Sequence, residues 1–156
     1  MAEKDVSESL GHIRRGLADA EAAIQQHPSA TIAVYASNVD TFGRQSFDWA
    51  LSAVPALTVE DAQAVDRYML AMSFMSAWYH LHGNKAARDV AAQSAATLVS
   101  GVGFESMFAF KAMLHYESEW KRALSAAGIG TRSGAGCAGV LLLLLASGAT
   151  GLLVLI

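Results

Sequence analysis

The sequence predicts an all-α protein: a helical bundle of about five helices followed by a C-terminal transmembrane helix. Apolar residues recur at steps of three and four through much of residues 1–126, and no stretch alternates with a period of two. Residues 133–156 carry no charged side chain and are rich in leucine. We therefore expect a cytoplasmic helical bundle at 1–126, a glycine-rich linker at 127–138 and a membrane anchor at 139–156.

The first helix is predicted by an apolar stripe that ends before Pro28. Its members follow one another at steps of four and three, so they share one face of a helix. This face is a candidate partner-facing surface, although packing inside its own bundle is the more common fate of such a stripe. The large side chains of the stripe are Val6, Leu10, Ile13, Leu17 and Ile24.

The second helix is expected over residues 29–53, before Pro55. The Thr58 hydroxyl can then cap a third helix that runs to about residue 82. From Tyr68 to Leu81 this third helix has no formally charged residue and is apolar on nearly every side, so we expect it to be the central helix.

Two further helices complete the predicted bundle. Gly83 and Asn84 make the turn before the fourth helix, and a pair of glycines separates the fourth helix from the fifth. The predicted ranges of these helices are 85–100 and 104–126. Methionine side chains should fill the irregular spaces of the core. They are Met69, Met72, Met75, Met107 and Met113.

The C-terminal run is long enough to cross a bilayer. As a helix at about 1.5 Å per residue, residues 133–156 would extend roughly 36 Å, more than the roughly 30 Å of a hydrocarbon core. At roughly -0.5 kcal/mol each, its strongly apolar side chains favour insertion by a term on the order of -5 kcal/mol. The side chains expected to contact lipid are Val140, Leu141, Leu142, Leu143, Leu144, Leu145, Leu152, Leu153, Val154, Leu155 and Ile156.

Basic residues precede this run and none follows it, which predicts a single-pass protein with its N-terminal domain in the cytoplasm. Small residues spaced four apart, Ala135 with Gly139 and Ser147 with Gly151, are candidates for helix association in lipid. Cys137, near the expected membrane boundary, is a candidate for reversible acylation.

Composition excludes several classes of function. The net charge of -3 and the lack of a basic cluster argue against nucleic-acid binding. One cysteine allows no intramolecular disulfide, and residues 1–27 contain no uninterrupted apolar run that could serve as a signal-peptide core. No phosphate-binding loop or nucleophile motif occurs, so we expect neither an enzyme nor a cofactor.

Histidine spacing offers one metal-site hypothesis. His115 and Glu119 lie four apart on one predicted helix and could hold a metal if His80 or Asp66 approached from the third helix. The alternative is an ordinary surface pair, and we expect no metal site.

Three functional hypotheses follow. The leading one is a tail-anchored interaction or regulatory module, whose partners are membrane lipid and either another protein or a second copy of the chain. The second is a membrane-active or pore-forming protein, in which residues 68–81 and 90–110 also insert. The third is a ribosomal precursor with a helical leader and a hydrophobic C-terminal cargo segment that is processed.

Overall fold

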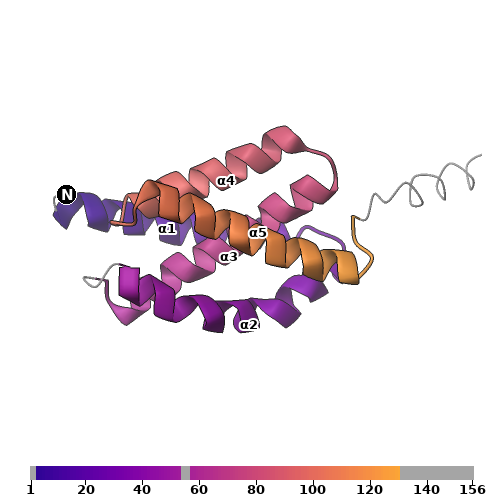
Figure 1. Ribbon diagram of the computed structural model, residues 1–156, viewed down its shortest axis with the longest axis horizontal. Helices are drawn as coiled ribbons and strands as arrows, with labels where there is room; N and C mark the ends of the chain where they lie inside the picture. Colours follow the sequence, from indigo (N-terminus) through magenta and orange to yellow (C-terminus); the bar gives the residue numbers. More distant parts are fainter. Residues whose placement is uncertain (1–2, 54–56, 131–156) are drawn as a thin grey trace, which may run out of the picture.

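The computed structural model describes residues 3–53 and 57–130, with side chains described at 5–43 and 57–130. The described residues form five helices and no strand, which confirms the all-α bundle (Figure 1). The helices are α1 (Glu3–Ile24), α2 (Ser29–Ala53), α3 (Val59–Leu81), α4 (Lys85–Ser100) and α5 (Ser106–Ala126).

The helix boundaries follow local capping chemistry. Thr58 is the N-cap of α3, where its hydroxyl oxygen accepts a hydrogen bond of 3.1 Å from the backbone N–H of Asp61. Asn84 caps α4 in the same way through Ala87. The fifth helix begins two residues later than predicted, because Glu105 adopts an extended conformation with φ -62° and ψ 132°.

The bundle is arranged around α3, as its apolar sequence predicts. This helix packs against each of the other four, whereas α1 touches α4 only sparsely and α2 touches α5 only sparsely. Figure 1 shows α2 below α3 and α4 above it, with α5 crossing in front of α3. The surface of α3 is therefore incompletely covered in two places, between α1 and α4 and between α2 and α5.

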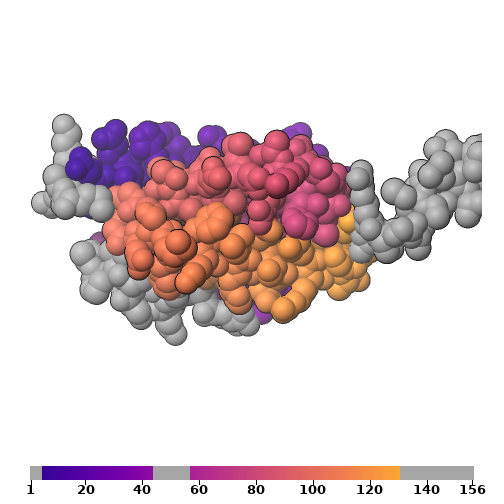
Figure 2. Space-filling view, turned by 45° about the horizontal axis from the view of Figure 1, so that its top comes forward, coloured from indigo at the N-terminus to yellow at the C-terminus, as the bar shows by residue number. Residues whose placement is uncertain are grey.

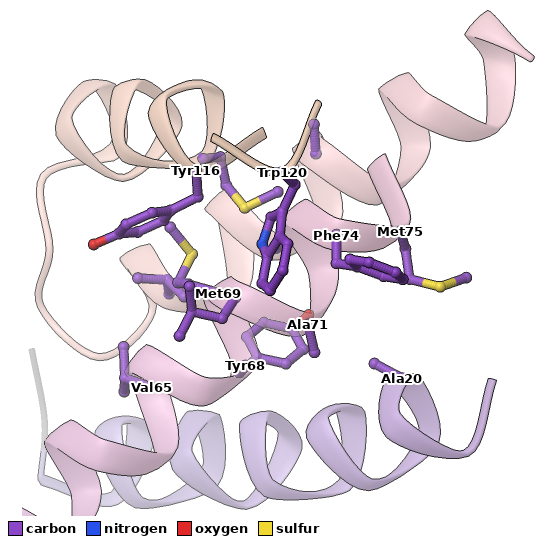
Figure 3. Close-up of a cluster of buried hydrophobic side chains, with 14 of the residues drawn as sticks. Ala20, Val65, Tyr68, Met69, Ala71, Phe74, Met75, Tyr116 and Trp120 are labelled. Carbon is purple, nitrogen blue, oxygen red and sulfur yellow. The ribbon is translucent and has the colours of Figure 1, made fainter. Parts of the chain in front are cut away.

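Aromatic side chains form the centre of the core. The fully buried Trp120 ring of α5 lies 5.0 Å from the Phe74 ring of α3, edge to face (Figure 3). The Tyr35 ring of α2 stacks on Trp120 at 5.4 Å. Phe42 meets Trp120 from α2 at 4.7 Å. The rings of three helices thus interlock at one point, which fixes the positions of α2, α3 and α5 relative to one another.

The methionines divide between core and surface. Met69, Met75 and Met113 are buried as predicted, whereas Met72 is half-buried and Met107 is 58% exposed. Met107 lies in the first turn of α5, at the end of the bundle, where few neighbours can cover it. The prediction that all five fill the core is therefore wrong for Met107.

Within residues 3–53 and 57–130, none of the helices is sufficiently long and apolar to span a bilayer. The predicted anchor at 139–156 and most of the predicted linker lie outside the described residues. The described chain ends at Gly130, whose positive φ of 66° and close approach to Leu81 both require glycine. The chain thus leaves the bundle beside the C-terminal end of α3.

Candidate functional site

An apolar groove lies between α1 and α4, with α3 as its floor. Its cavity volume is about 430 Å³, within the range of pockets that bind ligands or peptide side chains. The walls carry small residues one helical turn apart, Gly16 and Ala20 on α1 and Ala87 and Ala91 on α4. Small walls leave room for the backbone of a docked segment to approach both helices.

The groove floor is one stripe of α3. Tyr68, Met72, Met75 and Tyr79 follow one another at steps of four, three and four, so they share a face of the helix. Burial raises the pKa of Tyr68 from 10 to about 12, so this phenol stays neutral up to a higher pH than an exposed tyrosine does. Methionine side chains adapt to differently shaped partners, which suits a binding floor.

The α4 wall carries a large exposed side chain. Val90 lines the groove and is 64% exposed. Figure 2 shows α4 lying between α1 and α5 on one face of the molecule. Among the described residues that line the groove, Asp19 on α1 is the one charged side chain. An uncharged apolar segment therefore matches the lining better than a charged one.

A second feature is a buried carboxylate that joins three helices. Glu117 of α5 is 2% exposed and accepts hydrogen bonds from Arg88 of α4, at 2.8 Å from Nε and 3.0 Å from Nη2. Ser76 of α3 donates its hydroxyl to the same carboxylate. Lys121 Nζ lies 3.6 Å away and His80 Nδ1 3.8 Å away.

The charges around Glu117 decide its ionisation. Burial alone would raise its pKa, but the hydrogen bonds from Arg88 and Ser76 and the charges of Arg88 and Lys121 outweigh burial and hold the pKa below its ordinary value. The hydrogen bond to Glu117 likewise raises the pKa of Arg88. Because the carboxylate is ionised and fully engaged, it clamps α3, α4 and α5 together and is poorly placed to act as a catalytic base.

The sequence contained a signal for this buried carboxylate. Met113, Glu117, Trp120 and Leu124 fall at steps of four, three and four on α5, so Glu117 lies on the apolar stripe. An acidic residue on such a stripe indicates a buried ion pair. Its partner Arg88 comes from another helix. The spacing of apolar residues within one helix does not predict which helices pack together.

The apolar stripe of α1 packs on the chain's own core. Ile13 and Ile24 are fully buried, and Val6, Leu10 and Leu17 are partly buried against the core cluster. Ile13 and Ile24 are thus covered by the bundle, whereas Val6, Leu10 and Leu17 keep part of their surface exposed. The neighbouring α1 residues Gly16 and Ala20 line the α1–α4 groove.

In the described part of the chain, no three His, Cys, Asp or Glu side chains lie close enough together to hold a metal ion. His115 and Glu119 both line a cavity of about 340 Å³ between α2 and α5. Glu119 accepts a hydrogen bond of 2.9 Å from Arg122, and His80 lies near Glu117 instead. The partner of Glu119 in the described chain is therefore Arg122 of its own helix.

The segments of the membrane-active hypothesis belong to the bundle. Residues 68–81 lie within α3, and residues 90–110 are divided between α4 and α5. The anchor and helix-association residues predicted after Arg132, together with Cys137, lie outside the described residues. No family model, no curated protein and no solved structure matches the chain.

Proposed function

We propose that this chain is an interaction module held at a membrane by residues 139–156, with its helical bundle on the cytoplasmic side. The observation that carries the proposal is that α3 already has four helical neighbours. A further apolar helix therefore has no place at the centre of the bundle. A segment with no charge over residues 133–156 must bury its side chains elsewhere, and a bilayer offers the largest apolar volume.

The five described helices share a hydrophobic core. Trp120, Phe74 and Met69 are completely buried, and they belong to a core cluster whose described members lie between Val6 and Ile129. The apolar tail is thus not needed to complete this core, which argues against its being an ordinary buried helix. The exit point at Gly130, at one end of the bundle, leaves the tail free to enter a bilayer.

The contact surface in this proposal is the α1–α4 groove, and its partner is an apolar helix. Helical ligands bind such grooves through side chains at positions i, i+3 or i+4, and i+7. The exposed Val90 and the adaptable Met72 and Met75 provide the apolar contacts. Self-association in the membrane through Ala135 with Gly139 and Ser147 with Gly151 remains part of the proposal.

Fractionation tests the anchor. The full-length chain should resist alkaline carbonate extraction from membranes, and a chain ending at Arg132 should not. A full-length chain with Leu143→Arg and Leu144→Arg is the sharper comparison, because two charges at the centre of the span oppose insertion by about 5 kcal/mol or more. Extraction of all three chains alike would overturn the anchor.

Two variants test the remaining parts. Gly151→Leu should reduce the oligomer size of the full-length chain in mild detergent if the small residues mediate association, and an unchanged size removes that idea. In the membrane-bound chain, a photo-reactive cross-linker at Val90 should trap one defined helical segment, whereas the same group at Val59, which is 56% exposed, should not. Equal labelling at both positions would contradict the groove as the contact surface.

A further inference from the structure

The α1–α4 groove and the C-terminal tail have complementary surfaces. The described lining of the groove is apolar, with Asp19 as its one charged member, and the tail carries no charge after Arg132. On a helix, Leu141, Leu145 and Leu152 share one stripe, at i, i+4 and i+11. This is the spacing with which a helix places its anchors in a groove.

The end of the described chain brings the tail close to the groove. A Cβ added to Gly130 would lie 2.7 Å from Leu81 Cβ, so the chain leaves the bundle at the C-terminal end of α3. Tyr79, two residues before Leu81, lines the groove, and so does Ala87 near the start of α4. The groove thus opens at the same end of the bundle as the exit of the chain.

The predicted linker is long enough for the tail to reach the groove from Gly130. Leu81 and Tyr79 face different sides of α3, so the chain must pass around a helix about 10 Å across. Residues 131–138, if extended, span about 26 Å. The exposed α3–α4 turn at Gly83 and Asn84 separates Leu81 from the groove residue Ala87 along the chain.

We infer that residues 139–156 dock as a helix in the α1–α4 groove of their own bundle when no membrane is present. A docked helix covers Val90, the most exposed of the large apolar side chains in the described chain. A bilayer and the groove then compete for the same apolar side chains. The inference rests on the proposed function for its regulatory part: insertion of the tail uncovers the groove, so the contact surface becomes available only at the membrane.

Disulfide cross-linking of the full-length chain tests the docking. In a Cys137→Ser background, Leu145→Cys in the tail is paired with Val90→Cys in the groove. The matched controls pair Leu145→Cys with Val59→Cys or Met107→Cys, which replace apolar residues of similar exposure at the opposite end of the bundle. All three surface positions are more than half exposed, so the substitutions should leave the bundle folded.

At submicromolar protein concentration without detergent, the intrachain bridge to Val90→Cys should form at least tenfold faster than either control bridge. Adding phosphatidylcholine vesicles should slow it several-fold, because the tail moves into the bilayer. Equal rates at the three positions overturn the inference. Interchain dimers in place of an intrachain bridge also overturn it, because they assign the groove to the tail of a second copy.

A second pair of variants separates this inference from the proposed anchor. Val90→Glu should weaken docking and speed vesicle binding of the full-length chain several-fold, whereas Val59→Glu should not change it. A chain that resists carbonate extraction but shows no cross-linking preference for Val90→Cys retains the anchor and loses the docking. A chain that cross-links at Val90→Cys but never binds membranes retains the docking and loses the anchor.

Discussion

The Arg88 guanidinium of α4 holds the Glu117 carboxylate of α5 through two hydrogen bonds, of 2.8 and 3.0 Å. This fork-like contact is the geometry in which a guanidinium and a carboxylate match best. Since Glu117 is almost completely buried, its charge depends on these donors for the solvation that water would otherwise supply. The pair therefore couples the positions of two helices that are connected only by a short loop.

Loss of the guanidinium should destabilise the bundle. Arg88→Met leaves a buried carboxylate without its main partner, and the free energy of unfolding should fall by about 3 kcal/mol, at the lower end of the range for broken buried pairs because Arg88 is partly exposed. Urea unfolding followed by circular dichroism measures the change. The matched control is Arg122→Met, whose exposed pair with Glu119 should contribute under about 1 kcal/mol. Equal losses in the two variants would contradict the role of Glu117.

Acid should remove the same stabilisation. The pKa of Glu117 is lower in the folded chain than its ordinary value of 4.5, so the folded state binds fewer protons than the unfolded state below that pH. Its contribution is therefore complete above pH 4.5 and is lost as the pH falls through the folded pKa. Urea unfolding of the wild-type chain and Glu117→Gln at several pH values should show a stability difference that narrows below pH 4.5. A difference that widens on acidification would refute the assignment.

The buried Tyr35 hydroxyl should lower the free energy of unfolding. This group is buried and has no hydrogen-bond partner among the described residues, and burial raises its pKa to about 12. Tyr35→Phe removes the unsatisfied hydroxyl and should raise the free energy of unfolding by about 1 kcal/mol. Thermal unfolding at pH 7 checks this, with Tyr79→Phe, at a half-buried position, expected to stay within about 0.5 kcal/mol of wild type.

Tyr35 should also make the stability of the bundle depend on pH in the alkaline range. Below pH 10 the hydroxyl is protonated in both states, but between pH 10 and about 12 the unfolded chain ionises and the folded chain does not. Stability should therefore fall over this interval as the pH rises. Tyr35→Phe should lose less stability than wild type between pH 10 and 12, as measured by urea unfolding, and an identical loss would show that Tyr35 does not titrate as described.

Two glycines of α1 should respond to alanine in opposite directions. At Gly11 an added Cβ meets nothing within 4 Å, so Gly11→Ala should stabilise the bundle by roughly 1 kcal/mol through helix propensity. At Gly16 the Cβ would lie 2.8 Å from Cε2 of the buried Tyr68. Gly16→Ala should therefore destabilise by about 1 kcal/mol or more. The midpoints of urea unfolding compare the two, and a stabilised Gly16→Ala chain would mean that the Tyr68 ring moves easily.

Helix positions were largely predictable, because apolar spacing and caps are local properties. The second helix was predicted at 29–53 and the fourth at 85–100, as observed, and Thr58 caps α3 as its sequence indicates. The central position of α3 followed from its lack of a polar face. These features depend on residues close together in the chain, and so a single sequence reveals them.

The sites were less predictable, because they depend on which helices become neighbours. The Glu117 carboxylate could be located on its apolar stripe, but its partner Arg88 could not. The sequence did not reveal the groove. Met72 and Tyr79 lie on an apolar helix and have the pattern of core residues. They are half-buried because α1 and α4 do not close over them. A gap between helices has no sequence pattern of its own.

The described bundle has an odd number of alternating helices, so Glu3 and Gly130 lie at opposite ends of it (Figure 1). The distance between these ends is set by the length of a helix such as α5, which at 21 residues extends about 32 Å. A circular permutant would need roughly ten extended residues to join them. Tandem copies joined by short connections would instead continue in one direction, as a rod of bundles placed end to end.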